Sequence, residues 1–152
     1  MKIYPSVEEI KEKYQSFKTV PVSTEIEADV SALTVLKKLK NVSSHCYMLE
    51  SNDDANSTGR YTFLGYDPKA EVSCTNYNVR FIDVKNYTGD PRKYIKQILD
   101  EHKAPKIENL PTFTGGLVGY FGYDYVKYSE PSLKLDAHDD GNFKDVDLML
   151  FD

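Results

Sequence analysis

The chain reads Cys46-Tyr47-Met48-Leu49-Glu50-Ser51 at its most informative point, where an apolar strand pattern runs into a carboxylate and a hydroxyl. A second strand pattern follows at Arg60 to Tyr66 and closes on Asp67-Pro68, a dipeptide that favours turns. We expect the two strands to pair around the polar loop 52–59. The pattern therefore predicts an antiparallel hairpin whose first strand ends in polar side chains.

Outward from the hairpin, three helices are expected from capping patterns. Ser6 precedes Glu9 by three residues, a capping box that predicts a helix over 6–17. Asp29 or Ser31 can cap a second helix, which should stop near Asn41. In the third helix, Asp90 is the expected N-cap, Pro91 takes the first helical position, and four residues mark the buried face: Tyr94, Ile95, Ile98 and Leu99.

Strand patterns occupy most of the remaining chain. Residues 19–27 alternate but contain Pro21, which favours an edge strand. Further strands are expected at 44–50, 60–66, 69–75, 78–84, 115–121 and 145–152. Asn76 is the turn candidate between two of them. Together these elements predict an α+β fold, with antiparallel sheet and flanking helices.

The last strand pattern, Asp145 to Asp152, alternates apolar residues up to the end of the sequence. An unpaired edge of this kind recruits other strands. We therefore expect this segment to be a strand or frayed edge that pairs with further chain, and the natural polypeptide to continue past Asp152.

Three motifs carry a family resemblance. Met48-Leu49-Glu50-Ser51 resembles the Leu-Leu-Glu-Ser element of anthranilate synthase component I, with Met in place of the first Leu. Gly59 to Gly65 resembles the strand that follows this element in the family, and Pro111 to Asp124 resembles its Gly-Gly-x-x-Gly-Tyr segment. Because Met and Leu are both apolar and of similar volume, the exchange at position 48 leaves the interpretation intact.

The resemblance implies that residues 1–152 are the amino-terminal regulatory domain of such a subunit. The complete subunit is an α/β/β/α layered protein, with two sheets sandwiched between helices. It makes anthranilate and pyruvate from chorismate and ammonia with Mg²⁺, and a glutamine amidotransferase subunit (component II) supplies the ammonia. The family's catalytic and metal-binding residues lie in a chorismate-utilising domain absent from this chain. We therefore assign no catalytic or metal residue here and expect the chain alone to be inactive.

In the family, the Leu-Leu-Glu-Ser element contributes to the site for tryptophan, the feedback inhibitor. The resemblance assigns that role to Leu49, Glu50 and Ser51. A carboxylate and a hydroxyl at a strand end can bind an α-ammonium group, while nearby apolar side chains receive a hydrophobic body. From the residues alone, a solvated strand end is the alternative.

Three other functions stay open. Aminodeoxychorismate synthase component I, of the folate pathway, has a similar amino-terminal region. The other two are a freestanding amino-acid-sensing module and a structural oligomerisation domain, neither of which would catalyse a reaction.

Composition fits a globular domain. Hydrophobic residues make up 40% and charged residues 28% of the 152 residues, which is ordinary for one folded domain. The net charge of −5 opposes binding to nucleic acid or anionic lipid. No apolar segment is long enough to span a membrane, and the amino terminus has no secretory pattern. We therefore expect a cytoplasmic protein with no nucleic-acid or membrane partner.

Several residues of chemical interest have simpler structural explanations. Cys46 and Cys74 are expected to be reduced, buried thiols inside strands. The glycines of 114–119 do not match a phosphate loop, so close backbone packing is the better account. Five aromatic residues nearby are expected in core and interdomain contacts: Tyr120, Phe121, Tyr123, Tyr125 and Tyr128. Asp136 to Gly141 with Asp147 approaches a calcium loop, but His138 and Asp147 break the ligand pattern, so a solvated acidic connector is expected.

Overall fold

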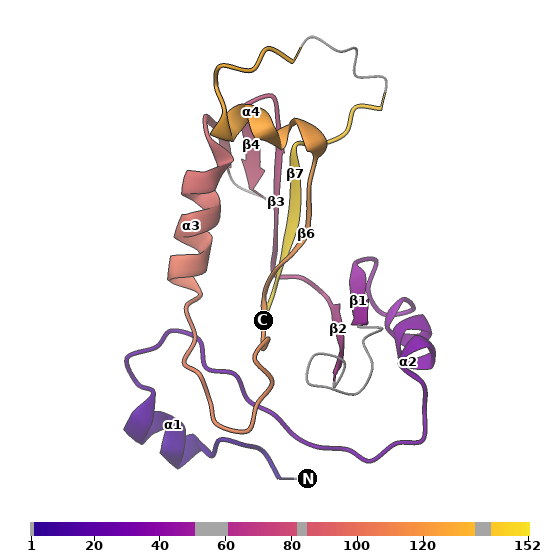
Figure 1. Cartoon of the computed structure of the whole chain (residues 1–152). Helices are drawn as coiled ribbons and strands as arrows, with labels where there is room; N and C mark the ends of the chain where they lie inside the picture. The colour runs from indigo at the N-terminus through magenta and orange to yellow at the C-terminus, as the bar shows by residue number, and fades with distance from the viewer. Residues whose placement is uncertain (1, 51–60, 82–84, 136–140) are drawn as a thin grey trace. The chain divides into compact units, whose positions relative to one another are not determined.

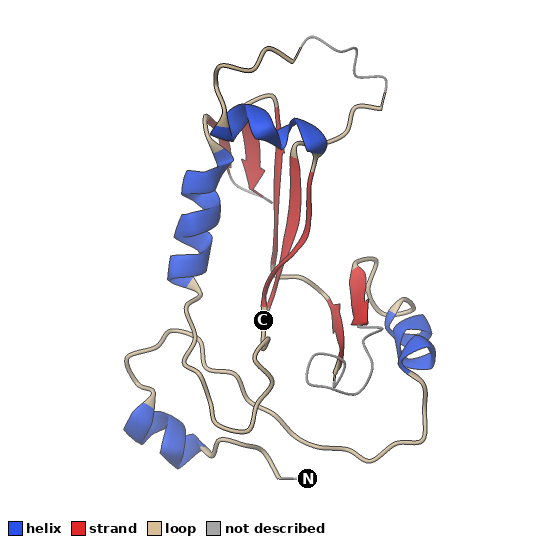
Figure 2. Ribbon diagram, viewed as in Figure 1, coloured by secondary structure: helices blue, strands red, loops and turns tan. Residues whose placement is uncertain are grey.

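The computed structural model describes residues 2–50, 61–81, 85–135 and 141–152. The chain forms two compact units (Figure 1). The first holds Met1–Pro68, Glu101–Gly116 and Asp152, and the second holds Lys69–Asp100 and Leu117–Phe151. The strands form two antiparallel sheets with helices beside them (Figure 2). The predicted α+β class is therefore confirmed.

The first helix of the first unit, α1 (Val7–Lys13), begins where the capping pattern predicts. The Glu9 backbone N–H donates to the Ser6 hydroxyl over 3.2 Å, which satisfies one of the unpaired donors of the first turn. The helix ends at Lys13 rather than near residue 17, because Tyr14 leaves helical geometry. The predicted start is correct and the predicted end is four residues too late.

The second helix, α2 (Ala32–Leu39), is capped by Ser31, whose hydroxyl accepts from the Thr34 backbone N–H over 3.2 Å. The prediction of a strand at 19–27 is wrong. Of that segment, only Ser23 pairs, in an isolated antiparallel bridge to Tyr4. Pro21, near the start of the segment, has no backbone N–H to donate, which weakens any ladder of strand hydrogen bonds there.

The predicted hairpin is present in the first unit as β1 (Cys46–Glu50) and β2 (Thr62–Tyr66), which pair antiparallel. The Ser43 side chain fixes its open end. Its oxygen accepts from the backbone N–H groups of His45 and Asp67 over 3.2 and 3.1 Å and donates to the His45 carbonyl over 2.8 Å. One hydroxyl therefore joins the start of β1 to the residue after β2.

The second unit is built on a sheet in the order β5-β4-β3-β7-β6. The strands are β3 (Ala70–Thr75), β4 (Asn78–Phe81), β5 (Lys85–Thr88), β6 (Gly116–Phe121) and β7 (Val146–Phe151). Asn76 and Tyr77 have φ values of 46° and 65° between β3 and β4, the signature of a type I′ hairpin turn. The turn predicted at Asn76 is confirmed. β5 was not predicted, because Lys-Asn-Tyr-Thr shows no alternation of apolar residues.

Of the strand or frayed edge predicted at Asp145 to Asp152, the strand is confirmed as β7, but the edge position is wrong. β7 lies between β3 and β6 and pairs with β3 from Val146 opposite Cys74 to Leu150 opposite Ala70. Val146 and Leu150 are at most 2% exposed. Its dense apolar pattern therefore belongs to a central strand, and the outer strands are β5 and β6.

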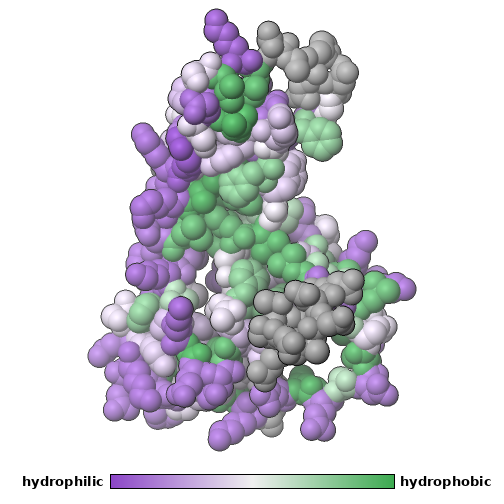
Figure 3. Space-filling model, in the orientation of Figure 1, coloured by the Kyte–Doolittle hydropathy of each residue, from purple (hydrophilic) through white to green (hydrophobic). Residues whose placement is uncertain are grey.

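Helices complete the core of the second unit. α3 (Pro91–Glu101) begins as predicted, because Asp90 accepts from the Arg92 backbone N–H over 2.9 Å. Ile98 is buried, and Tyr94 and Ile95 pack against the core, but Leu99 is 49% exposed, so its predicted burial is wrong. The side of α3 away from the sheet is hydrophilic in Figure 3. Nine buried residues form the core cluster: Ala70, Val72, Cys74, Val79, Ile98, Tyr128, Val146, Leu148 and Leu150.

A short turn of 3-10 helix, η1 (Tyr123–Tyr125), leads into α4 (Val126–Ser129). Neither was predicted. Tyr128 is buried and Tyr125 packs against the core, as expected, whereas Tyr123 is 92% exposed. Close backbone packing of the glycines is confirmed at Gly119, where a Cβ atom would collide with the main chain of Asp147.

Both cysteines are free thiols, and the predicted burial is confirmed for Cys74 but not for Cys46, which is half-buried. The described helices are all too short or too polar to cross a membrane.

Candidate functional site

Two of the three residues assigned to tryptophan lie at the carboxyl end of β1. Leu49 and Glu50 are its last two residues, and both are exposed, Leu49 to 46%. Ser51 lies outside the described residues. The structure therefore brings two of the three predicted residues to one strand end, with side chains open to solvent.

The register of the hairpin separates these two side chains. Leu49 lies opposite Phe63, and Glu50 lies opposite Thr62. Because successive side chains of a strand point to opposite faces, Leu49 shares a face with Tyr47, while Glu50 shares the other face with Met48. A ligand can touch both Leu49 and Glu50 only at the strand end itself.

The Leu49 face of the hairpin is aromatic. The ring of Phe113, from the segment before β6, meets the ring of Phe63 edge-to-face at 5.5 Å between centroids and that of Tyr47 at 6.5 Å. Tyr61 contacts Phe63 at 5.9 Å. Such edge contacts are the geometry aromatic pairs prefer. The four rings make a connected apolar group beside Leu49.

Gly65 lets the Tyr47 ring lie flat across the hairpin. The two residues are directly opposite in the register, and a Cβ atom on Gly65 would collide with the Tyr47 ring. Burial raises the pKa of Tyr47, because a phenolate is costly away from water. The phenol therefore stays neutral, and the Leu49 face carries no charge from it.

This arrangement can bind a small molecule with two chemical parts. A carboxylate at the strand end suits an ammonium group, and an uncharged aromatic face suits an apolar body. Sequence reasoning found the strand end but not the aromatic face. Phe113 could not be placed there from sequence, because it lies far along the chain from β1.

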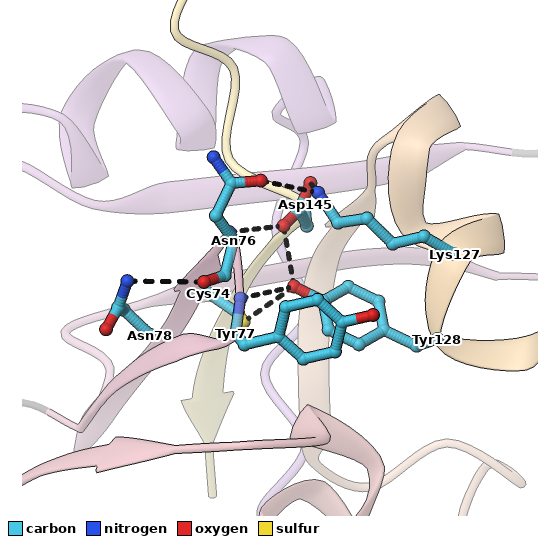
Figure 4. Close-up of polar contacts among 7 residues, drawn as sticks. All are labelled: Cys74, Asn76, Tyr77, Asn78, Lys127, Tyr128 and Asp145. Atoms are coloured by element: carbon cyan, nitrogen blue, oxygen red, sulfur yellow. Dashed lines mark hydrogen bonds and ion pairs between the residues drawn. The ribbon is translucent and has the colours of Figure 1, made fainter. Parts of the chain in front are cut away.

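A buried polar network in the second unit was also missed (Figure 4). The Asp145 side chain is only 5% exposed and lies just before β7. It accepts the Tyr128 hydroxyl over 2.6 Å, the Asn76 backbone N–H over 2.8 Å and the Lys127 ammonium over 2.8 Å. Lys127 also donates to the Asn76 side-chain oxygen over 2.9 Å. The network ties the β3–β4 turn to α4 and to the start of β7.

The pKa values of the network have clear physical causes. Burial by itself would raise the pKa of Asp145, but hydrogen bonds from Lys127 and Tyr128 outweigh burial and leave that pKa below its ordinary value. Burial, with the hydrogen bonds to Asp145 and Cys74, raises the pKa of Tyr128. Burial also raises the pKa of the Cys74 thiol. Asp145 is therefore charged at neutral pH, while Tyr128 and Cys74 keep their protons.

Both the proton and the oxygen of the Tyr128 hydroxyl have hydrogen-bond partners. Its one hydroxyl proton goes to Asp145, and its oxygen accepts the Tyr77 backbone N–H over 3.0 Å. The contact with Cys74 Sγ at 3.2 Å must then use the thiol proton. A network whose donors and acceptors are engaged with one another stabilises the fold and offers no free acid or base.

The calcium-like pattern has no support as a site. Asp136 to Asp140 lie outside the described residues. Asp147 lies in β7 and pairs with Lys144 over 2.9 Å, and Lys144 also reaches Glu71 over 3.1 Å. Among the residues that the structure describes, no three His, Cys, Asp or Glu side chains come together in a way that could hold a metal ion.

Comparison with known proteins gives a consistent set of relatives. The chain is 34% identical over 131 residues to "Anthranilate synthase component 1" of Acetivibrio thermocellus, covering 84% of this chain and 26% of the relative. It is 36% identical over 133 residues to the protein of that name from Acinetobacter calcoaceticus, covering 80% and 26%. A "Probable anthranilate synthase component 1" of Schizosaccharomyces pombe is 34% identical over 143 residues, covering 91% and 27%. No protein-family model matches the chain.

The resemblance predicted from three motifs is thereby confirmed over most of the chain. The chain spans about a quarter of the length of these relatives.

Proposed function

We propose that this chain, as a relative of anthranilate synthase component 1, is the amino-terminal, tryptophan-sensing region of such a subunit in tryptophan biosynthesis. The observation that carries the proposal is the similarity to component 1 proteins over 80–91% of the chain. The exposed end of β1, with Leu49 and Glu50 beside an aromatic face, supports the sensing role. The names of these relatives favour anthranilate over aminodeoxychorismate as the product.

The reaction of the whole subunit is proposed from the resemblance to the family. Chorismate and ammonia would give anthranilate and pyruvate, with ammonia supplied by a glutamine amidotransferase subunit and Mg²⁺ as the metal. The described residues offer no set of magnesium ligands, so none of them is proposed to bind the metal. No catalytic role is proposed for residues 1–152, and their inactivity in isolation stays a prediction, as does a cytoplasmic location.

In this proposal, tryptophan binds at the carboxyl end of β1 and inhibits the enzyme from there. The Glu50 carboxylate would hold the α-ammonium group of tryptophan, and Leu49 would contact its apolar body. Ser51 is proposed as a hydrogen-bonding partner from the sequence motif alone. An effector inhibits only when it binds two states of an enzyme unequally, so these residues should affect inhibition and leave the uninhibited rate unchanged.

The experiment is a tryptophan inhibition curve for a component 1 subunit as long as the relatives, with residues 1–152 of this chain as its amino-terminal part. Glu50→Ala and Ser51→Ala should each weaken inhibition by roughly ten- to a hundredfold, the cost of a lost hydrogen bond to a charged group. Chorismate kinetics without tryptophan should stay unchanged. Glu12→Ala, the same change at an exposed site on α1, is the matched control. Unchanged inhibition in both variants would refute the proposed site.

A further inference from the structure

We propose that Tyr61 and Phe63 form an aromatic wall of the effector site, that this wall selects an amino acid with an aromatic side chain, and that Phe113 is the positioning residue behind it. The inference rests on the proposed tryptophan-sensing role and adds residues outside the motif at 48–51.

The hairpin register brings the wall beside Leu49. Leu49 lies directly opposite Phe63, so the two side chains stand on the same face. Tyr61 comes two residues before Phe63 and contacts its ring at 5.9 Å. Leu49 is 46% and Tyr61 40% exposed. On this face, the described side chains nearest the strand end are thus apolar, adjacent and exposed.

Behind this opening the same face is packed. Phe113 meets Phe63 and Tyr47 edge-to-face, and the Tyr47 ring lies over Gly65. Tyr61 is exposed, whereas Phe63, Tyr47 and Phe113 are half-buried. The packed rings limit how far the Phe63 ring can move.

The chemistry of the wall points to an aromatic ligand. A flat apolar side chain can lie against Leu49 and contact the rings of Tyr61 and Phe63, which gains both apolar burial and favourable ring geometry. The described hairpin residues of this face, Tyr47, Leu49, Tyr61, Phe63 and Gly65, carry no charged side chain, whereas Glu50 points to the other face. A charged or strongly polar ligand side chain that lay against these residues would lose its hydration and gain no partner from them.

Phe113 has a different role from Tyr61 and Phe63, because it supports the wall rather than contacting the ligand. It reaches the hairpin from the segment before β6, and its ring is the common neighbour of Tyr47 and Phe63. We assign it no contact with the ligand. Its role is to hold the two strands and the Phe63 ring in place.

The test of the wall uses Tyr61→Leu in a component 1 chain of family length, with tryptophan and leucine as the two probes. Tyr61→Leu should weaken tryptophan inhibition roughly three- to tenfold, the value of an aromatic contact, and narrow the preference for tryptophan over leucine. Tyr61→Phe should keep that preference. Tyr123→Leu, the same change at a site that is 92% exposed, is the matched control and should change nothing.

The test of Phe113 uses Phe113→Leu, which keeps an apolar side chain of similar size. Tryptophan inhibition should weaken, kcat/KM for chorismate should not change, and amide hydrogen exchange should quicken in β1 and β2 but not in β3 and β7. Unaltered exchange in the hairpin would overturn the positioning role.

The outcomes separate this inference from the proposed function. If Glu50→Ala weakens inhibition while Tyr61→Leu leaves both inhibition and the tryptophan-to-leucine preference unchanged, the wall is refuted and the sensing role stands. If neither variant changes inhibition, both proposals fail together.

Discussion

In the second unit, nine buried side chains form one hydrophobic cluster that spans the sheet, α3 and α4. In the first unit, α1 and α2 bury no residue, and Ile107 is the one large aliphatic side chain that the described residues of this unit bury. Hydrophobic side chains of the first unit are instead exposed, among them Leu33 at 51% and Val42 at 73%. Hydrophobic atoms interrupt the hydrophilic surface around α2 in Figure 3.

This difference has a physical consequence. Apolar burial is the main favourable term in folding, so the second unit carries most of the stability of the chain. The first unit is stabilised by helix caps, a hairpin and a small aromatic group, which together contribute far less to the free energy of folding than the core of the second unit does. Low local stability is the common condition of segments that respond to ligands, and the proposed effector site lies in this unit.

The largest expected contrast comes from the same substitution in each unit. Leu150→Ala, in the core of the second unit, should lower the free energy of unfolding by about 3–5 kcal/mol, the usual cost of a buried Leu-to-Ala change. Leu33→Ala, on the exposed side of α2, should change it by less than about 0.5 kcal/mol. Urea unfolding measured by circular dichroism checks both. Equal losses would mean that the two units do not differ as described.

The buried network gives the next largest effect. Asp145→Asn should cost about 2–3 kcal/mol, because Lys127 and Tyr128 lose a charged acceptor in a buried place. Asp100→Asn, which removes an exposed pair with Lys96, should cost less than about 1 kcal/mol. Denaturant midpoints of the two variants provide the comparison, and a loss for Asp145→Asn as small as that for Asp100→Asn would contradict it.

The same network predicts a pH dependence. The pKa of Asp145 in the folded chain is below its ordinary value, so its contribution is fully present above the unfolded pKa of about 3.9. The contribution is lost as the pH falls through the lower, folded pKa. Wild-type stability should therefore fall below about pH 4 more steeply than that of Asp145→Asn. Unfolding curves between pH 2 and 7 measure this, and parallel profiles would exclude Asp145 as the cause.

In the first unit, a smaller and local effect is expected from Gly65→Ala. The added methyl group collides with the Tyr47 ring, which should cost about 1–2 kcal/mol. Each unit contains one cysteine, so thiol labelling can follow them separately. Cys46 should label faster in the variant, and Cys74 should not.

The double variant Gly65→Ala with Tyr47→Ala is the control. Because it removes the colliding ring, the two changes should be non-additive. Strictly additive effects would show that the ring is not the cause.

The smallest effect concerns the cap of α2. Ser31→Ala removes the acceptor for the Thr34 N–H and should cost about 1 kcal/mol, confined to α2. Ser16→Ala, at an exposed position outside the helices, is the control. Hydrogen exchange of residues 32–39 checks the prediction, and faster exchange in the second unit would contradict its local nature.

The elements that sequence predicted correctly are those with local physical causes. Ser6, Ser31 and Asp90 cap helices because a side-chain oxygen reaches a backbone N–H within three residues, and Asn76 turns because it tolerates a positive φ. β7 was recognised as a strand from its alternation. Its central position was not, because the neighbours of a strand depend on pairing with distant residues such as Ala70 and Cys74.

The candidate site shows the same limit. The motif at 48–51 indicated the strand end, and the structure places Leu49 and Glu50 there. Their separation onto two faces follows from the strand period. The contribution of Phe113 could not be predicted, because nothing local to residue 113 specifies its contact with Tyr47 and Phe63.

The most direct test of the contrast between the units is hydrogen exchange, peptide by peptide, in a component 1 chain of family length that carries residues 1–152. Without tryptophan, β1 and β2 should exchange faster than β3 and β7. Saturating tryptophan should slow exchange in β1 and β2 and leave β3 and β7 unchanged. The account would be contradicted if tryptophan protected β3 and β7 instead, or if the β1–β2 hairpin showed no response.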